Sequence, residues 1–280
     1  MKIIKNLSEK EYNEIPAIRS SVLSTIDKKT MAHAKAQIDG IVESTSAMRL
    51  GSAAHDFLLR PDVFSKVWGV HSENYNGTNK AGKEEKEQLL TSFRADKLIK
   101  FDQVEMFKAW QKNLLASTLT AKIFNNITDT ELSLVWKEDG LDCKARIDAV
   151  AKIGDLTLLI DFKSTNNATQ SDFERACINY GYLIQSSHYL AGAKACKLID
   201  KNNNNFIHVL LEKEAPYLTA CYCLDDASLE IGDIRRDKAM QRYKLALESG
   251  KWPAYPDKIE SVAMPHWYIQ QQGEEITTLN

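Results

Sequence analysis

Two aspartates and a lysine in the middle of the chain have the types and spacing of a hydrolytic metal site. Asp148 ends the segment Ala145-Arg-Ile-Asp148, and Asp161 and Lys163 form an Asp-x-Lys pair further along. Gly154-Asp155 between them predicts a two-residue hairpin turn, because glycine is favoured at its first position. That turn places Asp148 opposite Asp161, with Cβ atoms about 4.5–5.5 Å apart. Strand alternation puts Lys163 on the same face.

Opposed carboxylates repel each other and destabilise a strand pair unless a cation lies between them. We therefore expect a divalent cation between Asp148 and Asp161. Carboxylate ligands favour Mg²⁺, with Mn²⁺ also possible, and proteins commonly hold Mg²⁺ with one or two carboxylates plus phosphate oxygens. The Lys163 ammonium would then stabilise charge on a phosphate or orient the attacking water. Together the three side chains predict metal-assisted phosphodiester hydrolysis.

Spacing alone leaves a second interpretation open. Asp148 and Asp161 would then be solvent-facing residues of an ordinary hairpin with Lys163 as a surface charge, since a one-residue slip of the turn reverses one face. The segment Leu158 to Phe162 counts against this, because it is apolar on both faces around the aspartate, as in a buried central strand. A buried carboxylate without a partner is costly.

The rest of the chain predicts helices, strands, a helix, strands and a final helix, in that order. Apolar residues recur at helical spacing through residues 20–60, Pro61 marks a boundary, and 96–118 forms another helix. The later elements expected are strands at 131–137, 142–153 and 156–163, a helix at 171–197, strands at 206–212 and 217–224, and a helix at 226–249. This order predicts an α/β fold with a central mixed, largely antiparallel sheet flanked by helices.

Length and composition set the limits of the interpretation. The chain has 280 residues, 44% of them hydrophobic, and no Pro/Gly-rich linker divides it. We therefore expect one domain. Its expected parts are a mainly helical region at 1–125, the catalytic sheet and helix at 126–225, and a C-terminal helix and tail at 226–280.

Composition also excludes several classes of protein. No apolar run is long enough to cross a bilayer, and the start lacks the apolar core of a secretory signal, so we expect a cytoplasmic protein with no membrane partner. The five cysteines form no Cys-x-x-Cys pair, which disfavours a zinc ribbon or an iron–sulfur site. The net charge of −2 means that any attraction to DNA must come from a local basic surface.

Four motifs in order resemble the PD-(D/E)XK nuclease superfamily, in its RecB-like branch. They are Leu50-Gly-Ser-Ala-Ala-His55, Ala145-Arg-Ile-Asp148, Ile160-Asp-Phe-Lys-Ser-Thr165 and Gln185-Ser-Ser-His-Tyr189. The histidine-bearing segment and Gly250-Lys-Trp-Pro-Ala-Tyr255 are similar to nuclease domains of the exodeoxyribonuclease VIII (RecE) type. The likeness spans nearly the whole chain. An Asp-x-Lys pair alone is weak, but four ordered motifs are specific.

This resemblance implies residue roles and an activity. The metal ligands it implies are His55, Asp148, Asp161 and the backbone carbonyl of Phe162. Lys163 becomes the catalytic lysine, while Gln185 and Tyr189 support the site or contact DNA. The implied activity is 5′→3′ digestion of one strand of duplex DNA from an end, in phage-type recombination. Such enzymes form trimeric or tetrameric rings and work with a single-strand annealing protein of the RecT type, so we expect a homo-oligomer.

Some residues keep two interpretations. His55 lies among apolar helix positions, where a lone histidine is usually a hydrogen-bonded core residue. Only the resemblance favours His55 as a metal ligand. An imidazole ligand would shift the preference of the site toward Mn²⁺. Glu131 is a further acidic ligand or, as we favour, a solvated strand end. Lys80, Lys83 and Lys86 follow a polar loop and form one helical stripe, which is a solvated face or a basic segment near DNA.

Three other functions stay open at this stage. A RecB-like nuclease trimming single strands and an endonuclease both use the same residues. A catalytically silent module that binds DNA ends is a different class, and the intact set of Asp148, Asp161 and Lys163 speaks against it.

Overall fold

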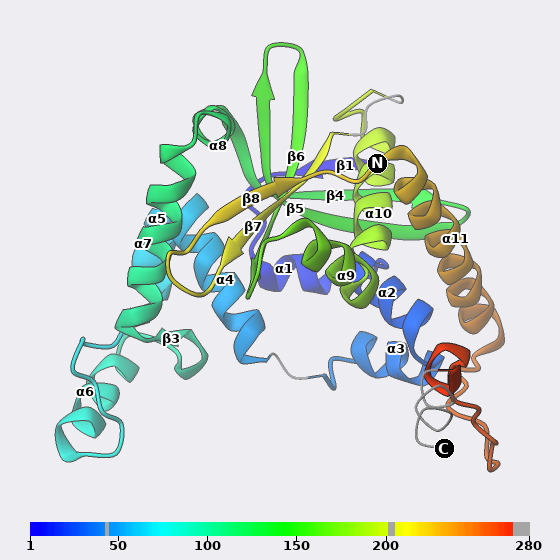
Figure 1. Cartoon of the computed structure of the whole chain (residues 1–280), viewed down its shortest axis with the longest axis horizontal. Helices are drawn as coiled ribbons and strands as arrows, with labels where there is room; N and C mark the ends of the chain where they lie inside the picture. Colours follow the sequence, from blue (N-terminus) through cyan, green and yellow to red (C-terminus); the bar gives the residue numbers. More distant parts are fainter. Residues whose placement is uncertain (43–44, 201–204, 271–280) are drawn as a thin grey trace, which may run out of the picture.

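The computed structural model describes residues 1–42, 45–200 and 205–270 (Figure 1). Within them six strands form one sheet in the order β1-β4-β5-β6-β7-β8. These strands are β1 (Lys2–Ile4), β4 (Ile127–Glu138), β5 (Leu141–Ile153), β6 (Leu156–Thr165), β7 (Phe206–Glu212) and β8 (Thr219–Tyr222). Neighbours are antiparallel except β6 and β7, which are parallel. The predicted mixed, largely antiparallel sheet is confirmed.

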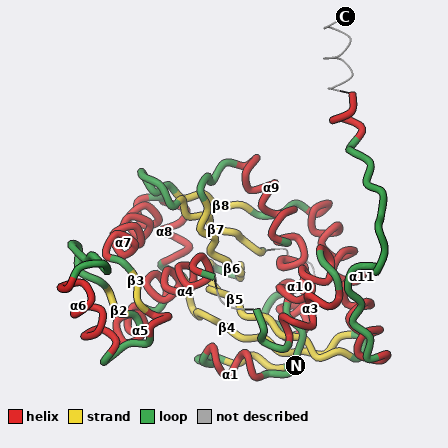
Figure 2. Tube along the Cα trace, turned by 90° about the horizontal axis from the view of Figure 1, so that it is seen from below, coloured by secondary structure: helices red, strands yellow, loops and turns green. Residues whose placement is uncertain are grey.

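Helices flank this sheet on both faces (Figure 2). They are α1 (Glu9–Glu14), α2 (Ser20–Lys28), α3 (Met31–Ile38), α4 (Ser46–Leu59), α5 (Pro61–Val67), α6 (Lys80–Leu90), α7 (Phe101–Ala116), α8 (Thr118–Phe124), α9 (Gln170–Tyr180), α10 (Tyr182–Ala195) and α11 (Asp226–Ser249). One core lies between the sheet and α2, α10 and α11, and a second lies between the sheet and α4, α5, α7 and α8. Two short strands form a separate parallel pair. β2 (Gly69–Val70) follows α5, and β3 (Leu98–Ile99) follows a 3-10 turn at Ala95–Lys97.

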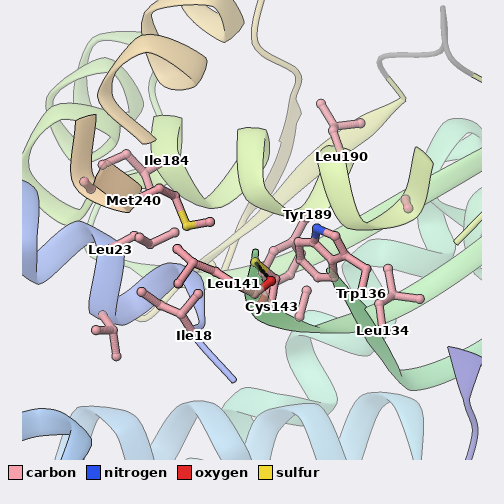
Figure 3. Packing of buried hydrophobic residues seen from close by; sticks show 14 of the residues in the cluster. Ile18, Leu23, Leu134, Trp136, Leu141, Cys143, Ile184, Tyr189, Leu190 and Met240 are labelled. Atoms are coloured by element: carbon pink, nitrogen blue, oxygen red, sulfur yellow. Dashed lines mark hydrogen bonds between the residues drawn. The ribbon is translucent and has the colours of Figure 1, made fainter. Parts of the chain in front are cut away.

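Strand alternation explains the first core. Leu132, Leu134 and Trp136 alternate along β4 and are almost fully buried in this core. Figure 3 shows Leu134 and Trp136 beside α10. The contact is tight: a Cβ added at Gly192 of α10 would lie 2.6 Å from the Trp136 ring. Only glycine at this position lets the helix approach the sheet so closely, and the helix in turn positions the side chains on its other turns.

The predicted hairpin register is confirmed. Ile153 pairs with Leu156 across the turn, and Gly154 adopts a positive φ of 60°. Pairing continues in this register to Ala149 opposite Ile160, which makes Asp148 and Asp161 the next opposed positions. The buried stretch from Leu158 to Phe162 excludes the interpretation as a solvent-facing hairpin.

Several predicted elements needed correction. The single helix predicted at 171–197 is wrong: α9 and α10 are separated at Gly181, whose φ of 79° is left-handed. Residues 20–60 hold three helices, and Pro61 begins α5. The helix predicted at 96–118 begins only at Phe101, because a 3-10 turn and β3 precede it.

The division into one domain stays a prediction, and residues 271–280 of the predicted tail lie outside the described residues. Among those described, no helix combines the length and the apolar character needed to cross a membrane.

Candidate active site

The main-chain ladder between β5 and β6 stops just before the two aspartates. The last paired residues are Ala149 and Ile160. Beyond them the amide of Phe162 donates to the side chain of Asp148, at 2.8 Å from Oδ2, instead of to a main-chain carbonyl. The strands therefore separate where Asp148 and Asp161 face each other. Both side chains are buried, with 8% and 1% of the residue exposed.

Asp161 is held from two sides. Its Oδ2 lies 2.6 Å from Lys163 Nζ, and Gln185 Nε2 donates to its Oδ1 at 2.6 Å. Burial by itself raises the pKa of Asp161, but the Lys163 ammonium outweighs it and holds that pKa below the usual value. Burial lowers the pKa of Lys163, but the carboxylates of Asp161 and Asp148 reverse this effect and raise it. Asp161 and Lys163 are therefore a charged pair in which the carboxylate is buried and the lysine is partly exposed.

His55 reaches the site from α4, on the opposite side of β6 from α10. Thr45 caps the helix by accepting from the Met48 amide at 3.2 Å, and Ala54 and Leu58 pack into the second core. The next residue, Asp56, is buried, accepts from Trp68 Nε1 at 2.8 Å and pairs with Arg60. These contacts fix the end of the helix that carries His55.

The His55 ring lies among acceptors. Its Nε2 is 3.5 Å from Asp148 Oδ2 and 3.4 Å from the Phe162 carbonyl oxygen, and its Nδ1 is 3.7 Å from Glu131 Oε1. Burial lowers the pKa of His55, but the carboxylates of Asp148 and Glu131 outweigh burial and raise it to about 9. Burial raises the pKa of Asp148 to about 7; the Asp161 carboxylate adds to this, while the His55 charge opposes it.

These atoms fit a divalent cation. A carboxylate oxygen of Asp148 and a carbonyl oxygen of Phe162 both lie within 3.5 Å of the same imidazole nitrogen, which is the mixed oxygen and nitrogen set that Mg²⁺ and Mn²⁺ accept. The second carboxylate, Asp161, is close enough to raise the pKa of Asp148. Two buried carboxylates facing each other gain most from a bound cation.

Glu131 belongs to this cluster, which corrects the prediction of a solvated strand end. It lies inside β4, its side chain is only 12% exposed, and it forms an ion pair with Arg146. One ligand atom each from His55, Glu131 and Asp148 lie within 4.8 Å of one another. Burial raises the pKa of Glu131, but the nearby His55 imidazole and the Arg146 charge outweigh it and lower the pKa. This role could not be predicted from the sequence, because the partners of Glu131 come from other elements: His55 from α4 and Arg146 from β5.

Gln185 and Tyr189 share one face of α10, as predicted, but only Gln185 touches the aspartates. Tyr189 stands one turn further along and packs edge-on against Phe206, with the ring centroids 5.6 Å apart. Burial raises the pKa of Tyr189 well above its usual value, so its hydroxyl stays protonated. Tyr189 therefore packs in the first core and shares a cavity wall with Gln185.

The sequence interpretation missed His208. It is fully buried on β7, pairs in register with Asp161, and its Nδ1 lies 3.6 Å from Asp161 Oδ2. Its Nε2 is 3.0 Å from Ser186 Oγ. Burial lowers the pKa of His208, so the ring is neutral. The strand was predicted, but its parallel pairing with β6 was not, and only this pairing brings His208 to the site.

Two cavities border this cluster, and Tyr12, Arg19 and Arg146 line both of them. The first, of about 200 Å³, also borders His55 and Glu131. The second, of about 330 Å³, has further lining residues that include Lys163, Gln185, Tyr189, Tyr182 and Ser20 at the start of α2. The cluster is therefore reached from solvent along a surface that carries arginines.

The lysine stripe lies on α6, as predicted, near the short β2–β3 pair (Figure 2). Lys80, Lys83 and Lys86 are outside both cavities, and Lys80 pairs with Glu84 at 3.8 Å. Tyr75, before this helix, is stacked on His71 with ring centroids 3.6 Å apart. No described contact links the stripe to the candidate site.

A helix-flanked mixed sheet with a buried Asp, an Asp-x-Lys pair and a histidine is the arrangement of the PD-(D/E)XK class. Residues 20–265 match the family described as "PDDEXK-like domain of unknown function (DUF3799)", and the chain belongs to that family. A comparison with curated proteins finds no match.

One solved structure shares the fold over almost its whole length. The crystal structure of a "Putative exonuclease" from Eubacterium rectale superposes with a TM-score of 0.61 and 12% identity, covering 96% of this chain and 98% of that one. This likeness confirms the fold. A second match, the crystal structure of SSO0001, covers 71% of this chain and 87% of that one at 15% identity. Its TM-score is 0.28, which is too low to support a structural argument.

Proposed function

We propose that this protein is a metal-dependent exodeoxyribonuclease that hydrolyses phosphodiester bonds of duplex DNA from an end, in the 5′→3′ direction. The observation that carries the proposal is the meeting of Asp148, Asp161, Lys163 and His55, from β5, β6 and α4, in one buried cluster. Membership of the PDDEXK-like family supports a nuclease. Direction, duplex preference and a place in phage-type recombination rest on the RecE-like sequence motifs alone.

The residues take distinct roles in this proposal. Asp148, Asp161, His55 and the carbonyl of Phe162 would hold Mg²⁺, or Mn²⁺. When bound, such a cation supplies Lewis-acid activation of the phosphate and of a water molecule. Lys163, paired with Asp161 and with Nζ 5.1 Å from the centre of the Tyr182 ring, stabilises negative charge on the phosphate oxygens. Gln185 holds Asp161 in place, and Tyr189 supports Gln185.

The surface around the cluster suits a polyanion despite the net charge of −2. Arg19 and Arg146 line both cavities. Arg60 and Lys97 line the first, together with the carboxylates of Glu9, Asp56 and Glu131. Cations beside the reacting phosphate position the backbone without reading its sequence. Arg19, which lines both cavities and has no carboxylate partner among the ion pairs of the described residues, is the cation we assign to the DNA backbone.

The direct test compares linear and covalently closed duplex DNA of one sequence, incubated with the protein and Mg²⁺. An exonuclease degrades the linear form and leaves the closed circle intact. Equal attack on both forms identifies an endonuclease, and degradation of single strands alone identifies a RecB-like trimming nuclease. Duplexes labelled at one 5′ or one 3′ end report the direction. Asp161→Asn, which removes a carboxylate, is the inactive control, and binding without turnover by the parent protein identifies a silent module.

A ring-shaped homo-oligomer and a single-strand annealing partner of the RecT type are further proposals from the same motifs. Native mass spectrometry with and without duplex DNA tests the first, with a trimer or tetramer as the expected result. Co-purification with an annealing protein encoded alongside the nuclease tests the second.

A further inference from the structure

The two ring nitrogens of His55 face different partners. Nε2 lies beside Asp148 Oδ2 and the Phe162 carbonyl oxygen, whereas Nδ1 faces Glu131 Oε1. The two nitrogens of an imidazole point in divergent directions, so one cation binds only one of them. The Nε2 side carries the oxygens of the proposed metal site. Glu131 therefore lies behind the ring, although the 4.8 Å spacing of the ligand atoms by itself also permits direct ligation by Glu131.

Glu131 is itself held firmly. Its Oε2 pairs with the Arg146 side chain, which is 13% exposed, and the guanidinium lies 5.7 Å from the centre of the Tyr12 ring. Register places Glu131 between Thr130 and Leu132, directly across from Asp148 on β5. Its φ is 50°, a left-handed conformation at a residue with a side chain. Such backbone persists only where its surroundings hold it.

We propose that Glu131 is a positioning residue for His55: it accepts the Nδ1 proton and so leaves the Nε2 lone pair for the cation. Arg146 fixes the other carboxylate oxygen and thereby the direction of the acceptor. A carboxylate behind a ligating histidine fixes the ring tautomer and its orientation and makes the ligand nitrogen more basic. The inference rests on the proposed function, because the tautomer of His55 matters to metal binding only if His55 is a ligand.

The proposal requires His55 Nδ1 and Glu131 Oε1 to move closer together when a cation binds. Nδ1 and Oε1 are 3.7 Å apart, which is longer than a hydrogen bond. The two atoms need to approach by about 0.8 Å to reach the ordinary length of about 2.9 Å. Contacts of this kind are often long before the ligand binds and shorten in the complex.

Isothermal titration with Mn²⁺ in the absence of DNA tests the proposal. We expect Glu131→Ala to weaken Mn²⁺ binding by about 10- to 100-fold, the range for a lost outer carboxylate. Glu131→Gln should lose less, because the amide oxygen still accepts the Nδ1 proton. Asp27→Asn is the matched control: Asp27 is a similarly buried partner of an arginine, Arg235, away from the site. It should bind Mn²⁺ like the parent protein.

The ring tautomer distinguishes positioning from direct ligation. In the parent protein labelled with ¹⁵N-histidine and loaded with diamagnetic Zn²⁺, we expect the His55 proton on Nδ1 and the metal on Nε2. A proton on Nε2, or Mn²⁺ affinity unchanged in both Glu131 variants, overturns the proposal. This spectrum requires no variant to fold. A parent protein that binds Mn²⁺ with these properties but leaves DNA intact would refute the nuclease function and leave the role of Glu131 standing.

Discussion

The amide of Phe162 donates to Asp148 Oδ2 at 2.8 Å, while the carbonyl of the same residue lies 3.4 Å from His55 Nε2. One peptide segment thus holds a carboxylate and faces the imidazole from the other side. This is possible because the ladder between β5 and β6 stops at Ala149 and Ile160. The end of regular pairing frees main-chain groups of Phe162 to organise the site.

The first prediction concerns the stability of the metal-free protein. Burial raises the pKa of Asp148 from 3.8 to about 7, so the folded state binds a proton more tightly than the unfolded state. The parent therefore loses folding stability as the pH rises from about 4 to 7. Above pH 7 Asp148 is ionised in the folded state, and the loss of stability is complete. Asp148→Asn removes the charge. In EDTA at pH 8 we expect the variant to be more stable by about 1–4 kcal/mol.

Thermal unfolding at pH 4.5 and pH 8 measures this effect. The advantage of Asp148→Asn should shrink toward zero at the lower pH and should be offset by Mg²⁺, which stabilises only the parent. Asp155→Asn, at the exposed hairpin turn, serves as the control and should follow the parent at both pH values. A variant less stable than the parent at pH 8 without metal contradicts the prediction.

The second prediction concerns the pH dependence of metal affinity. The raised pKa values of His55, about 9, and Asp148, about 7, mean that a cation must displace protons from its ligands. Mn²⁺ affinity should therefore rise from pH 6.5 to pH 8.5, by about tenfold per pH unit for each proton displaced. Titration calorimetry in two buffers of different ionisation enthalpy counts the released protons. Affinity independent of pH over this range is the contrary result.

The third prediction separates catalysis from metal binding. Lys163→Met should reduce kcat by about 10²–10³-fold, because the phosphate loses a stabilising charge, while Mn²⁺ still binds. In the metal-free Lys163→Met variant, the buried Asp161 carboxylate has lost its lysine partner. We therefore expect this variant to be less stable than the parent by about 3–5 kcal/mol. The double variant Lys163→Met/Asp161→Asn lacks both charges of the pair. In urea unfolding, its loss of stability should be smaller than the sum of the losses of the two single variants. Full activity of Lys163→Met excludes the proposed role.

Local patterns were enough to predict the hairpin, and with it the core of the site. Glycine at the turn and alternation along the strands are properties of neighbouring residues, so they correctly placed Asp148 opposite Asp161. Contacts between distant segments were not predictable in this way. His208 reaches Asp161 through a parallel pairing, and Glu131 meets His55 from another strand; neither relation leaves a local pattern.

The missed helix break had a signal that was overlooked. Gly181 follows α9 at the position where a left-handed glycine commonly ends a helix. The residues on both sides continue a helical pattern, so α9 and α10 read as one element. The break redirects the chain, and α10 then carries Gln185 to Asp161.

The last prediction tests whether this break positions the site. Gly181 has a φ of 79°, and a Cβ there would lie 2.6 Å from Ser24 Oγ. Gly250 has a φ of 67° but nothing within 4 Å of an added Cβ. Gly250→Ala should therefore cost only the backbone strain, about 1 kcal/mol, whereas Gly181→Ala should cost about 1–3 kcal/mol more. Because Gly181 lines the same cavity as Lys163 and Gln185, only Gly181→Ala should also lower DNA turnover. Urea unfolding and the linear-duplex assay measure both effects, and equal behaviour of the two variants would show that the α9–α10 junction does not position Gln185.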